Sequence, residues 1–429
     1  MSRISISIRK KYWRLAVTCF VHCFAFTSQG RILDENSYRL TLQDVFKLAE
    51  KNSNGLERSR LKSIEMQAST KVAYSNFIPN IGLQSTLSSN EFLLSQKIYD
   101  GGASLAEVSL SKHREGSSKI EQLVELAKIR GEVIDAFYDA IISKRTTRFL
   151  DESSEKIESA MRRVEMQFKY RAIGRDAFLR AKVQIRKSRS EYFEARDAES
   201  EAVRKLSRLT HLANFKSDWL VDNIILEQLP KPLALQPLTD VDSRLRNRPQ
   251  RELLQISGQM LNDEKEIALA TDRINVSFNA SYGFGQRAPN FSVGYVYAVG
   301  FQYGLSLSIP FSSGYSIYAK KKVYSERQHE LERDLRILDD DAQFDYSERV
   351  EKLRRGWADI LAINQELSAS EDIWKEADAN FKVGVSSPDL WFEASANVRQ
   401  WKLRQLQKIK SYLIEFDRVN ALVQTTQSD

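Results

Sequence analysis

Residues 295–309 alternate strictly between apolar side chains and small or polar ones. The odd positions from Tyr295 to Ile309 are aromatic or aliphatic, whereas the even positions after Val296 are Ala, Gly, Gln or Ser. Successive side chains of a strand point to opposite faces, so the pattern predicts a β-strand with one apolar face. Strands usually span about 5–6 residues. The greater length favours a strand between lipid and water, with a half-buried strand of a soluble sheet as the alternative.

Three shorter segments, at residues 80–87, 92–99 and 276–284, alternate in the same way. A tight turn at 88–91 joins the first two into a hairpin, with Phe92, Leu94 and Ile98 on one face. In the third segment, Val276, Phe278, Ala280, Tyr282 and Phe284 alternate with Ser277, Asn279, Ser281 and Gly283. A turn at 286–294 then leads into the strand at 295–309. The chain therefore has four predicted strands, arranged as two hairpins.

Helical apolar spacing occupies most of the remaining sequence. Thr41, with Asp44 three residues later, predicts a capped helix start, and helical character continues to about Tyr74. A long helical stretch begins after Gly102 and is interrupted near Gly174; its apolar residues recur at intervals of three to seven, as in coiled coils. A helix over 103–166 would be about 96 Å long. Further helices are predicted at 238–272, with Pro249 in an early turn or at a break, and at 314–381.

The two halves of the chain repeat one order of elements: helix, β-hairpin, long helix, short break, helix. Phe168 matches Phe381 at an offset of 213 residues, and Asp176 matches Asp389 at the same offset. Such matching predicts an internal duplication. The predicted division is a first repeat at 31–213, a proline-containing linker at 214–237 and a second repeat at 238–429.

The first thirty residues have the composition of a secretory signal peptide. A basic segment is followed by a mostly apolar segment at 15–26 and then by small residues, which predicts a signal peptide over 1–30. The basic segment contains Arg3, Arg9, Lys10, Lys11 and Arg14 and no acid. Removing these five charges lowers the formal net charge from +7 to +2. The positive net charge of the full chain is therefore no argument for a nucleic-acid partner.

Cysteine usage and hydropathy narrow the class further. Both cysteines, Cys19 and Cys23, lie within the predicted signal peptide, so the mature chain is predicted to have no disulfide and no thiolate metal site. The cleavage site and a lipid on Cys19 stay open. No run of about 20 apolar residues occurs, which argues against a membrane-spanning helix.

The membrane interpretation of the strands requires more than one copy of the chain. An open sheet edge in hydrocarbon would leave backbone groups unpaired, and bacterial barrels begin at about 8 strands. Two copies would supply 8 strands and three would supply 12. The predicted inner face carries small residues that suit the wider barrel and favour three copies. These residues are Ser281, Gly283, Gly300, Gly304, Ser306 and Ser308.

Several motifs occur in an order shared with a known family. The opening segment Leu40-Thr41-Leu42-Gln43-Asp44-Val45 precedes Phe77-Ile78-Pro79-Asn80-Ile81 at the first strand. The segment Ser95-Gln96-Lys97-Ile98-Tyr99-Asp100-Gly101-Gly102 resembles S-Q-P-L-[FY]-D-G-G, and Phe381-Lys382-Val383-Gly384 with Ser387 resembles Y-x-x-G-x-x-S. From Leu40 to Val423 the chain resembles the TolC family of outer-membrane efflux and secretion channels. The resemblance implies a mainly α fold with a membrane β-barrel. A homotrimer would form a 12-stranded barrel in the outer membrane and a coiled-coil tunnel in the periplasm.

The resemblance also implies functional positions near the two helix–helix turns. A periplasmic gate of acidic side chains would include Glu393, with Asp389 and Asp176 displaced by one or more positions from the family pattern. Three copies of a carboxylate at a constriction would favour cations. The alternative is that these acids only complement helix dipoles. A periplasmic adaptor protein, linked to an inner-membrane transporter, would contact turns that contain Phe168, Gly174, Phe381, Gly384 and Ser387.

Catalytic chemistry has no support in the sequence. No H-E-x-x-H, G-x-x-x-x-G-K-[ST] or G-x-S-x-G motif is present. The run 339–341 of aspartates falls inside a helix, where consecutive side chains diverge, which favours a solvated face over a metal site. We predict no enzyme activity, no cofactor and no metal. The sequence does not separate small-molecule cargo from polypeptides of type I secretion. A pore-less periplasmic coiled-coil scaffold is the alternative function.

Overall fold

The computed structural model describes residues 39–85, 90–212, 214–222, 224, 229–232, 248–290, 294–311 and 314–424. Side chains between 284 and 299 and at 422–424 lie outside this description. The chain divides into two units, Met1–Arg39 and Leu40–Asp429, and the helices and strands named below all belong to the second unit. The predicted signal peptide, Cys19 included, falls outside the described residues. None of the helices in the described ranges is both long enough and apolar enough to cross a membrane.

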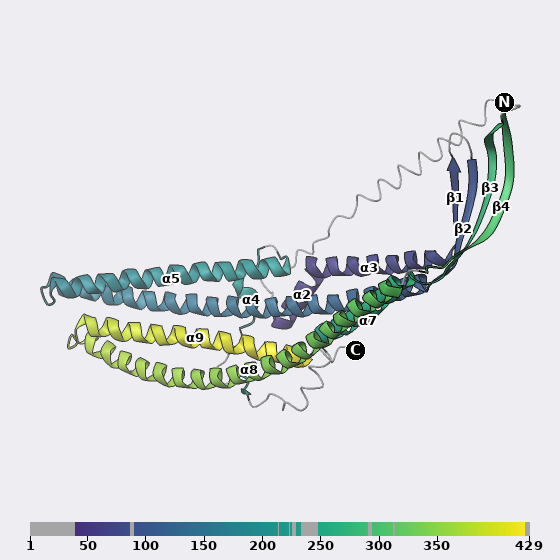
Figure 1. Ribbon diagram of the computed structural model, residues 1–429. Coiled ribbons are helices and arrows are strands. Elements are labelled where there is room, and N and C mark those ends of the chain that lie inside the picture. Colours follow the sequence, from purple (N-terminus) through teal and green to yellow (C-terminus); the bar gives the residue numbers. More distant parts are fainter. Residues whose placement is uncertain are drawn as a thin grey trace, which may run out of the picture. The chain divides into compact units, whose positions relative to one another are not determined.

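The predicted order of elements occurs twice (Figure 1). The first half contains α2 (Leu42–Asn52), α3 (Asn54–Tyr74), β1 (Asn80–Ser85), β2 (Asn90–Asp100), α4 (Ala103–Lys169) and α5 (Arg175–Thr210). The second half contains α7 (Pro249–Ala270), β3 (Asn275–Asn290), β4 (Gly294–Ser308), α8 (Gly314–Lys382) and α9 (Pro388–Gln424). The predicted long helices are confirmed: α4 has 67 residues and α8 has 69, which makes each about 100 Å long.

Several element boundaries differ from the sequence prediction. The helix predicted over 238–272 is wrong at residue 248, because Arg248 is the extended N-cap of a helix that begins at Pro249. The first helix is broken at Ser53, whose backbone is extended and whose hydroxyl accepts from the Leu56 amide to cap α3. The predicted turn at 286–294 is wrong for its first part, because β3 continues to Asn290 and pairs with β4 as far as Gly294. Gly and Pro residues in this segment resemble a turn in sequence, but antiparallel pairing extends through them. Pro249 lies at the first position of α7, the early-turn placement expected of it.

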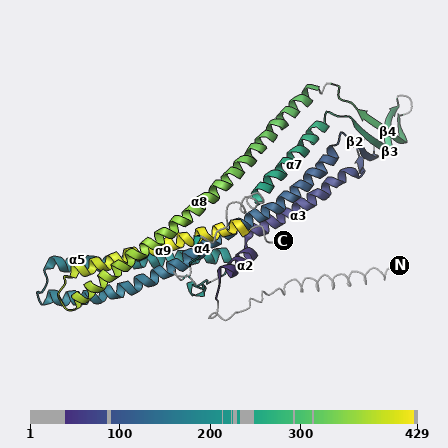
Figure 2. The ribbon, with the colours of Figure 1, turned by 90° about the horizontal axis from the view of Figure 1, so that it is seen from below.

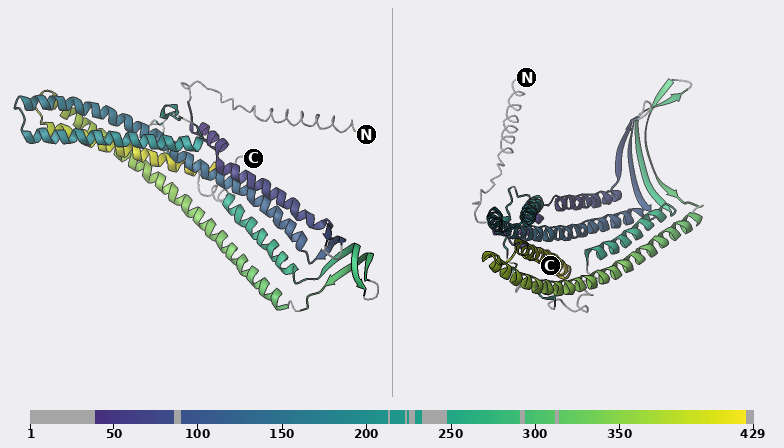
Figure 3. Two further views of the ribbon diagram at one scale, coloured as in Figure 1. Left: turned by 90° about the horizontal axis from the view of Figure 1, so that it is seen from above. Right: turned by 90° about the vertical axis from the view of Figure 1, so that its left-hand side faces the viewer.

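Each long helix packs against two shorter ones in succession. Helix α4 contacts α3 over the part near the sheet and α5 over the remainder, and α8 contacts α7 and then α9 (Figure 2). Beside the sheet, α3, α4, α7 and α8 lie side by side in that order (Figure 3). The buried residues Tyr346, Leu353, Ile360 and Leu367 of α8 recur every seven residues. This heptad spacing confirms the predicted coiled-coil packing.

Polar contacts connect the two halves where α4 meets α9. Arg418 donates to both carboxylate oxygens of Asp135 at 2.8 and 2.6 Å. One turn further along α4, the buried Tyr138 hydroxyl donates to Asp417 Oδ2 at 2.6 Å. Burial raises the pKa of the Asp417 carboxyl, and the Tyr138 hydrogen bond opposes this only in part. The halves are thus joined by specific side chains as well as by apolar packing.

The four strands form one antiparallel sheet in the order β1-β2-β3-β4. Cross-strand partners lie on the same face, and Leu83, Phe92, Tyr282 and Phe301 stand opposite one another across the sheet. In the adjacent row of cross-strand partners, which points to the other face, Ser281 stands opposite Gln302. The apolar face and the face of small and polar residues predicted from sequence are therefore confirmed for the described side chains of β1, β3 and β4. Strand β2 departs from the pattern at Leu93, opposite Ser281, and at Gln96, opposite Phe278. The polar face also carries Ser95, whose hydroxyl donates to Asn279 Oδ1 at 2.9 Å.

The register of β2 contains a β-bulge that strict alternation does not predict. Lys97 stands opposite Ser277 and Tyr99 stands opposite Val276, so Ile98 is the extra residue of the bulge. Because of this insertion, Tyr99 stands opposite an apolar residue of β3, whereas strict alternation places it on the polar face. Side-chain alternation in the sequence does not reveal such an insertion.

A glycine pair connects the sheet to the first long helix. Gly101 has φ +68°, and a Cβ there would approach the Ala270 carbonyl oxygen to 2.6 Å. The Gly101 carbonyl accepts from Arg273 Nη1 at 2.9 Å, which ties the end of β2 to the residues between α7 and β3. The two hairpins therefore enter the helical region at one shared junction, which requires glycine at this point.

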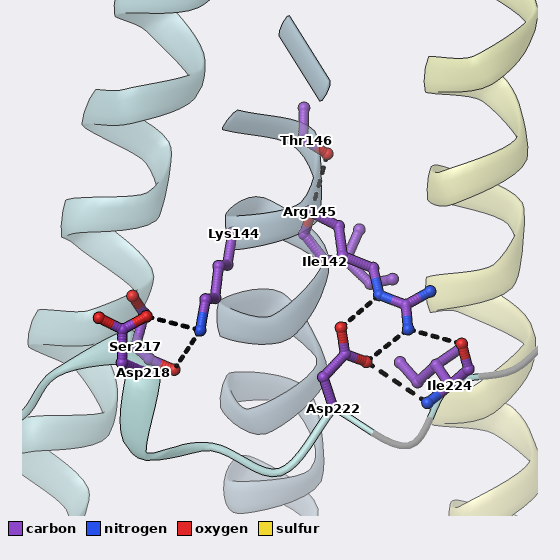
Figure 4. A network of polar contacts seen from close by, with 8 residues as sticks. All are labelled: Ile142, Lys144, Arg145, Thr146, Ser217, Asp218, Asp222 and Ile224. Carbon is purple, nitrogen blue, oxygen red and sulfur yellow. Dashed lines mark hydrogen bonds and ion pairs between the residues drawn. The ribbon is translucent and has the colours of Figure 1, made fainter. Parts of the chain in front are cut away.

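The described part of the linker between the halves is held against α4 (Figure 4). Arg145 makes a bidentate contact with Asp222, its Nε at 2.5 Å and its Nη2 at 2.6 Å, and also donates to the Ile224 carbonyl. Lys144 pairs with Asp218 at 2.7 Å. Leu40 forms a parallel bridge with Leu220 nearby. The predicted repeat and linker boundaries at 31–213, 214–237 and 238–429 stay a prediction.

Candidate functional site

The candidate site consists of the α4–α5 and α8–α9 turns, which have the same backbone hydrogen bonds. The Ala172 amide donates to the Gln167 carbonyl at 2.8 Å, and the Val385 amide donates to the Asn380 carbonyl at 2.9 Å. These pairs are related by the offset of 213. Both turns also contain one residue with positive φ, Arg171 at +58° and Gly384 at +78°. The two turns are thus copies of one helix-ending motif.

Glycine is favoured at Gly384 by its φ of +78°, although Arg171 adopts a positive φ of +58° at the corresponding position of the other turn. Because a side chain with positive φ costs about 1–2 kcal/mol, Gly384→Ala should destabilise its turn by that amount. Hydrogen exchange at the Val385 amide should then accelerate about tenfold, since 1.4 kcal/mol corresponds to a factor of ten.

Gly174→Ala is the matched control, because Gly174 has a φ of −72° and open space around its Cβ position. Equal exchange rates in the two variants would contradict the preference for glycine at Gly384.

An apolar cluster underlies both turns and fixes their relative position. It contains Ile157, Ala160, Met161 and Val164 of α4, Ala181 of α5, and Phe381, Trp391 and Phe392 of the second half. Trp391 packs edge-on against Phe392, with ring centroids 5.1 Å apart. Each large apolar side chain buried here contributes about 1.5–3 kcal/mol. The cluster therefore couples all four helices at this end.

The sequence-predicted contact residues differ in their exposure. Phe168 is partly exposed and stacks on Phe178 with centroids 4.5 Å apart. Gly174, Gly384 and Ser387 are exposed. Phe381 is only 3% exposed and belongs to the apolar cluster. It supports the turn from inside in this chain, so its expected part in a contact surface is revised.

The structure brings two of the predicted gate acids together through a base that sequence reasoning missed. Arg180 Nη2 lies 2.7 Å from Asp176 Oδ2 and 3.2 Å from Asp389 Oδ2. Asp176 begins α5 and Asp389 begins α9, so one guanidinium links the two halves. All three side chains are substantially exposed, and such ion pairs contribute about 1 kcal/mol or less each. The i,i+4 spacing of Asp176 and Arg180 was the available sequence signal.

The third predicted acid, Glu393, is exposed on a groove beside this ion pair. The groove lies between α5 and α9, has a volume of about 600 Å³ and is lined by Leu179, Arg180, Val183, Asp389, Phe392 and Glu393, among others. The groove has apolar walls and charges of both signs. It is therefore suited to a protein side chain or a helix more than to a small anion or cation alone.

A buried ion pair further along the same helices also has no sequence signal. Arg399 of α9 is 4% exposed, its Nε lies 3.4 Å from Glu191 Oε2 of α5, and its Nη1 donates to Ser395 Oγ. Burial lowers the pKa of the Arg399 guanidinium, which the Glu191 carboxylate opposes. Removing one partner of such a pair leaves an uncompensated charge, which usually costs more than the pair contributes.

Asp378 connects α8 to α9 near the tip, the end of the α4, α5, α8, α9 bundle that carries the two turns. Its contacts predict that the stability of the tip depends on pH. It accepts from Trp391 Nε1 at 2.9 Å and pairs with Lys382 at 2.5 Å. Burial raises its pKa, but the hydrogen bonds from Lys382 and Trp391 outweigh burial and leave the pKa below its ordinary 3.8. The stabilisation is thus present above 3.8 and is lost as the pH falls through the lower, folded-state pKa.

Asp378→Asn should remove this acid-dependent component. Between pH 5 and pH 2, the protection from hydrogen exchange at this end of the bundle, relative to the intrinsic exchange rate at each pH, should fall more in the wild-type chain than in the variant. Asp372→Asn serves as control, because Asp372 is 70% exposed and its pair with Lys375 joins residues three apart on the surface. Identical acid profiles for the wild-type chain and Asp378→Asn would rule out the assigned role.

Other side chains singled out in the sequence have structural partners. Asp339, in the aspartate run, accepts from Arg251 Nε of α7 at 2.9 Å. In the ranges that the structure describes, no group of three or more His, Cys, Asp or Glu side chains is arranged to hold a metal ion. The described side chains of the turns therefore present an ionic and apolar surface.

The fold is similar to that of solved outer-membrane channels. The Campylobacter jejuni CmeC outer membrane channel is 16% identical, with a TM-score of 0.76 over 90% of this chain and 87% of that chain. The open Neisseria gonorrhoeae MtrE outer membrane channel is 16% identical, with a TM-score of 0.70 over 89% and 88%. The Vibrio cholerae outer membrane protein VceC is 12% identical, with a TM-score of 0.72 over 89% and 95%.

The sequence itself matches no protein-family model and no curated relative. The structural likeness nevertheless extends over about nine tenths of the chain. The chain has the fold of the TolC-type outer-membrane efflux channels. The predicted fold class, mainly helical with long coiled coils and four strands in each copy, is confirmed.

Proposed function

We propose that the protein is the outer-membrane exit duct of a tripartite efflux or type I secretion system. Substrates pass without chemical change from a helical tunnel in the periplasm, through a barrel in the outer membrane, to the exterior. No nucleotide-binding motif occurs in the sequence, so the driving energy comes from an inner-membrane transporter, coupled through a periplasmic adaptor. Small toxic molecules and polypeptides are both compatible with such a duct.

The observation that carries the proposal is the two-faced sheet. Its outer face exposes large apolar groups, with Tyr303 73% and Leu305 70% exposed. Its other face is lined by Gly300, Gly304 and serines. A soluble sheet would cover the apolar face with another layer, whereas a barrel in a membrane places that face in lipid and the polar face around water.

Several copies of the chain are needed to complete this sheet. Strands β1 and β4 are its two edges, and such edges must be paired within a bilayer. The first turns of α8 follow β4. There, Ser316 and Lys320 lie on the side toward α7, because both contact Asp272 just after the end of α7. Tyr315 and Tyr318 point elsewhere and are 84% and 66% exposed. A neighbouring copy would cover these rings, and three copies would supply the 12 strands of a wide barrel.

The two turns are proposed as gate and adaptor contact. Asp176, Asp389 and Glu393, together with Arg180, form the gate, and repeated around an assembly they set the charge of its entrance. The exposed residues Phe168, Gly174, Gly384 and Ser387 contact the adaptor, with Phe381 supporting them from inside. Deleting residues 384–389 should abolish transport and adaptor cross-linking; unchanged transport would argue against this assignment.

Ion conductance of the purified protein in a planar bilayer tests the proposal. A duct gives discrete conductance steps of uniform size, because each insertion adds one assembly. The alternative, a pore-less periplasmic scaffold, gives no conductance at any protein concentration. A deletion strain examined for drug sensitivity and for secreted polypeptides then separates the two classes of cargo.

A further inference from the structure

The two helices at the edges of the α4, α5, α8, α9 bundle have opposite charge on their free faces. Helix α5 packs chiefly on α4, and α8 packs chiefly on α9, while α4 and α9 contact each other between them (Figure 1). The free faces of α5 and α8 therefore lie on opposite sides of the bundle. In the part of each helix nearest the tip, no other helix of the same chain covers either face.

The free face of α5 is basic. Five of its exposed residues are basic and follow one another at intervals of seven, four, three and seven, which places them on one side of a helix, with the exposed acid Asp197 beside the last of them. They are Arg175, Lys182, Arg186, Arg189 and Arg196. The buried residues Ala181, Ser188 and Ala195 mark the opposite side. Among the described residues no acid lies within 4.0 Å of Lys182 or Arg186. Arg189 Nη2 lies 3.6 Å from Glu158 Oε1 of α4, but both side chains of this pair are exposed, so Arg189 can also reach a neighbouring copy. Phe193, 51% exposed, adds an apolar group to the basic face.

The free face of α8 carries acids at corresponding levels. Glu366 and Glu376 are exposed and lie away from Leu353, Ile360 and Leu367, which face the interior. Between the two acids, Ile373 is 62% exposed, and Ala362 and Ala369 leave room for close approach. In the part of the chain that the structure describes, neither acid has a base within 4.0 Å.

The positions along the helices match. Lys182 lies eight residues beyond Gly174, and Glu376 lies seven residues before Val383. Arg189 lies fifteen residues beyond Gly174, and Glu366 lies seventeen residues before Val383. At 1.5 Å per residue, both pairs agree to about 3 Å or better.

We propose that α5 of one copy packs against α8 of the next copy through these faces. Lys182 then pairs with Glu376 and Arg189 with Glu366, while Phe193 and Ile373 supply apolar contact. Such a head-to-tail interface uses two different surfaces of each copy and closes into a ring. The proposal rests on the duct assembly proposed above and names the side chains that hold its tunnel together near the entrance.

Charge complementarity favours a second copy over a different partner on these faces. A partner protein would need one acidic surface for α5 and a separate basic surface for α8. Another copy of this chain provides the acidic surface for α5 and the basic surface for α8, at matching distances from the turns. Because the proposed pairs are between exposed side chains, their contribution falls with salt. Ion pairs of this kind set register and partner choice more than they set affinity.

Engineered cysteines on the two faces test the contact. The chain's two cysteines, Cys19 and Cys23, both precede the described residues, so Phe193→Cys with Ala362→Cys adds one pair within the folded unit. These positions lie within two residues of the same level when counted from the turns. Mild oxidation of the purified assembly should give disulfide-linked dimers and trimers, and the single variant Ala362→Cys should give none.

Charge reversal then identifies the pairing side chains. In the cysteine pair background, Lys182→Glu with Arg189→Glu should slow cross-linking at least about tenfold, as should Glu366→Lys with Glu376→Lys, because like charges are brought together. Combining all four reversals should restore the rate to within about twofold of the unreversed pair. Lys187→Glu, on the same helix outside the face, should leave the rate unchanged.

The possible results separate this inference from the proposed function. Uniform conductance steps without cross-linking would overturn the α5–α8 contact and leave the duct intact. Cross-linking that is indifferent to every reversal would overturn the charge pairing. Absence of both conductance and cross-linking would refute the duct itself.

Discussion

Lysine in place of Tyr282 or Phe301 is expected to prevent stable insertion of the protein into membranes. The two rings stand opposite each other on the apolar face of the sheet, where the proposed barrel meets lipid. A lysine on the lipid face of a membrane barrel costs about 2–4 kcal/mol near the bilayer midplane. An assembly of three copies would carry this cost three times, about 6–12 kcal/mol, which is comparable to the whole free energy of unfolding of a typical protein, about 5–15 kcal/mol.

The adjacent cross-strand pair of the same two strands provides a matched control. Ser281 and Gln302 also stand opposite each other, but on the polar face, so Ser281→Lys and Gln302→Lys should insert normally. Membrane fractionation and heat-resistant oligomer on gels would measure the outcome. Equal insertion of all four variants would show that the two faces do not differ in their surroundings.

Arg180→Glu is expected to open the proposed entrance. The wild-type guanidinium lies within 3.2 Å of both Asp176 and Asp389, and a carboxylate at this position replaces two attractions by two repulsions. Each unit-charge pair at about 4 Å is worth roughly 1 kcal/mol in water-like surroundings. The combined change of roughly 2–4 kcal/mol should shift a closed entrance toward open by a factor of ten or more.

Single-channel recording measures this shift. Arg180→Glu should show longer open times than the wild-type protein, and the difference should shrink at high salt, since exposed charges are screened. Arg162→Glu makes the same charge change on an exposed residue of α4 and should behave like the wild-type protein. A closed-state population unaffected by Arg180→Glu would remove the ion pair from the gate.

The sequence predicted those features that depend on local periodicity. Alternation predicted both faces of β3 and β4, because each strand residue points opposite to its neighbours. Heptad spacing predicted the long helices, and the offset of 213 predicted that the second turn copies the first. Each of these depends on residues close together in the chain, so sequence spacing alone was sufficient.

Features that depend on the meeting of distant segments were missed. The bulge between Lys97 and Tyr99 depends on pairing with β3, and Arg180 meets Asp389 only because α5 and α9 pack together. Phe381 resembles a surface residue at a helix end, but it is buried in one cluster with side chains of α4, α5 and α9. In each case the deciding partner lies far away in the sequence.

Imaging the purified protein in lipid nanodiscs, at a resolution that separates helices, would show whether several copies join their strands into one barrel. We expect three identical copies around one axis, a closed barrel of 12 strands within the disc, and a helical tunnel continuing from it on one side. A single water-soluble copy that stays outside the disc, with its four-stranded sheet open at both edges, would rule out the duct.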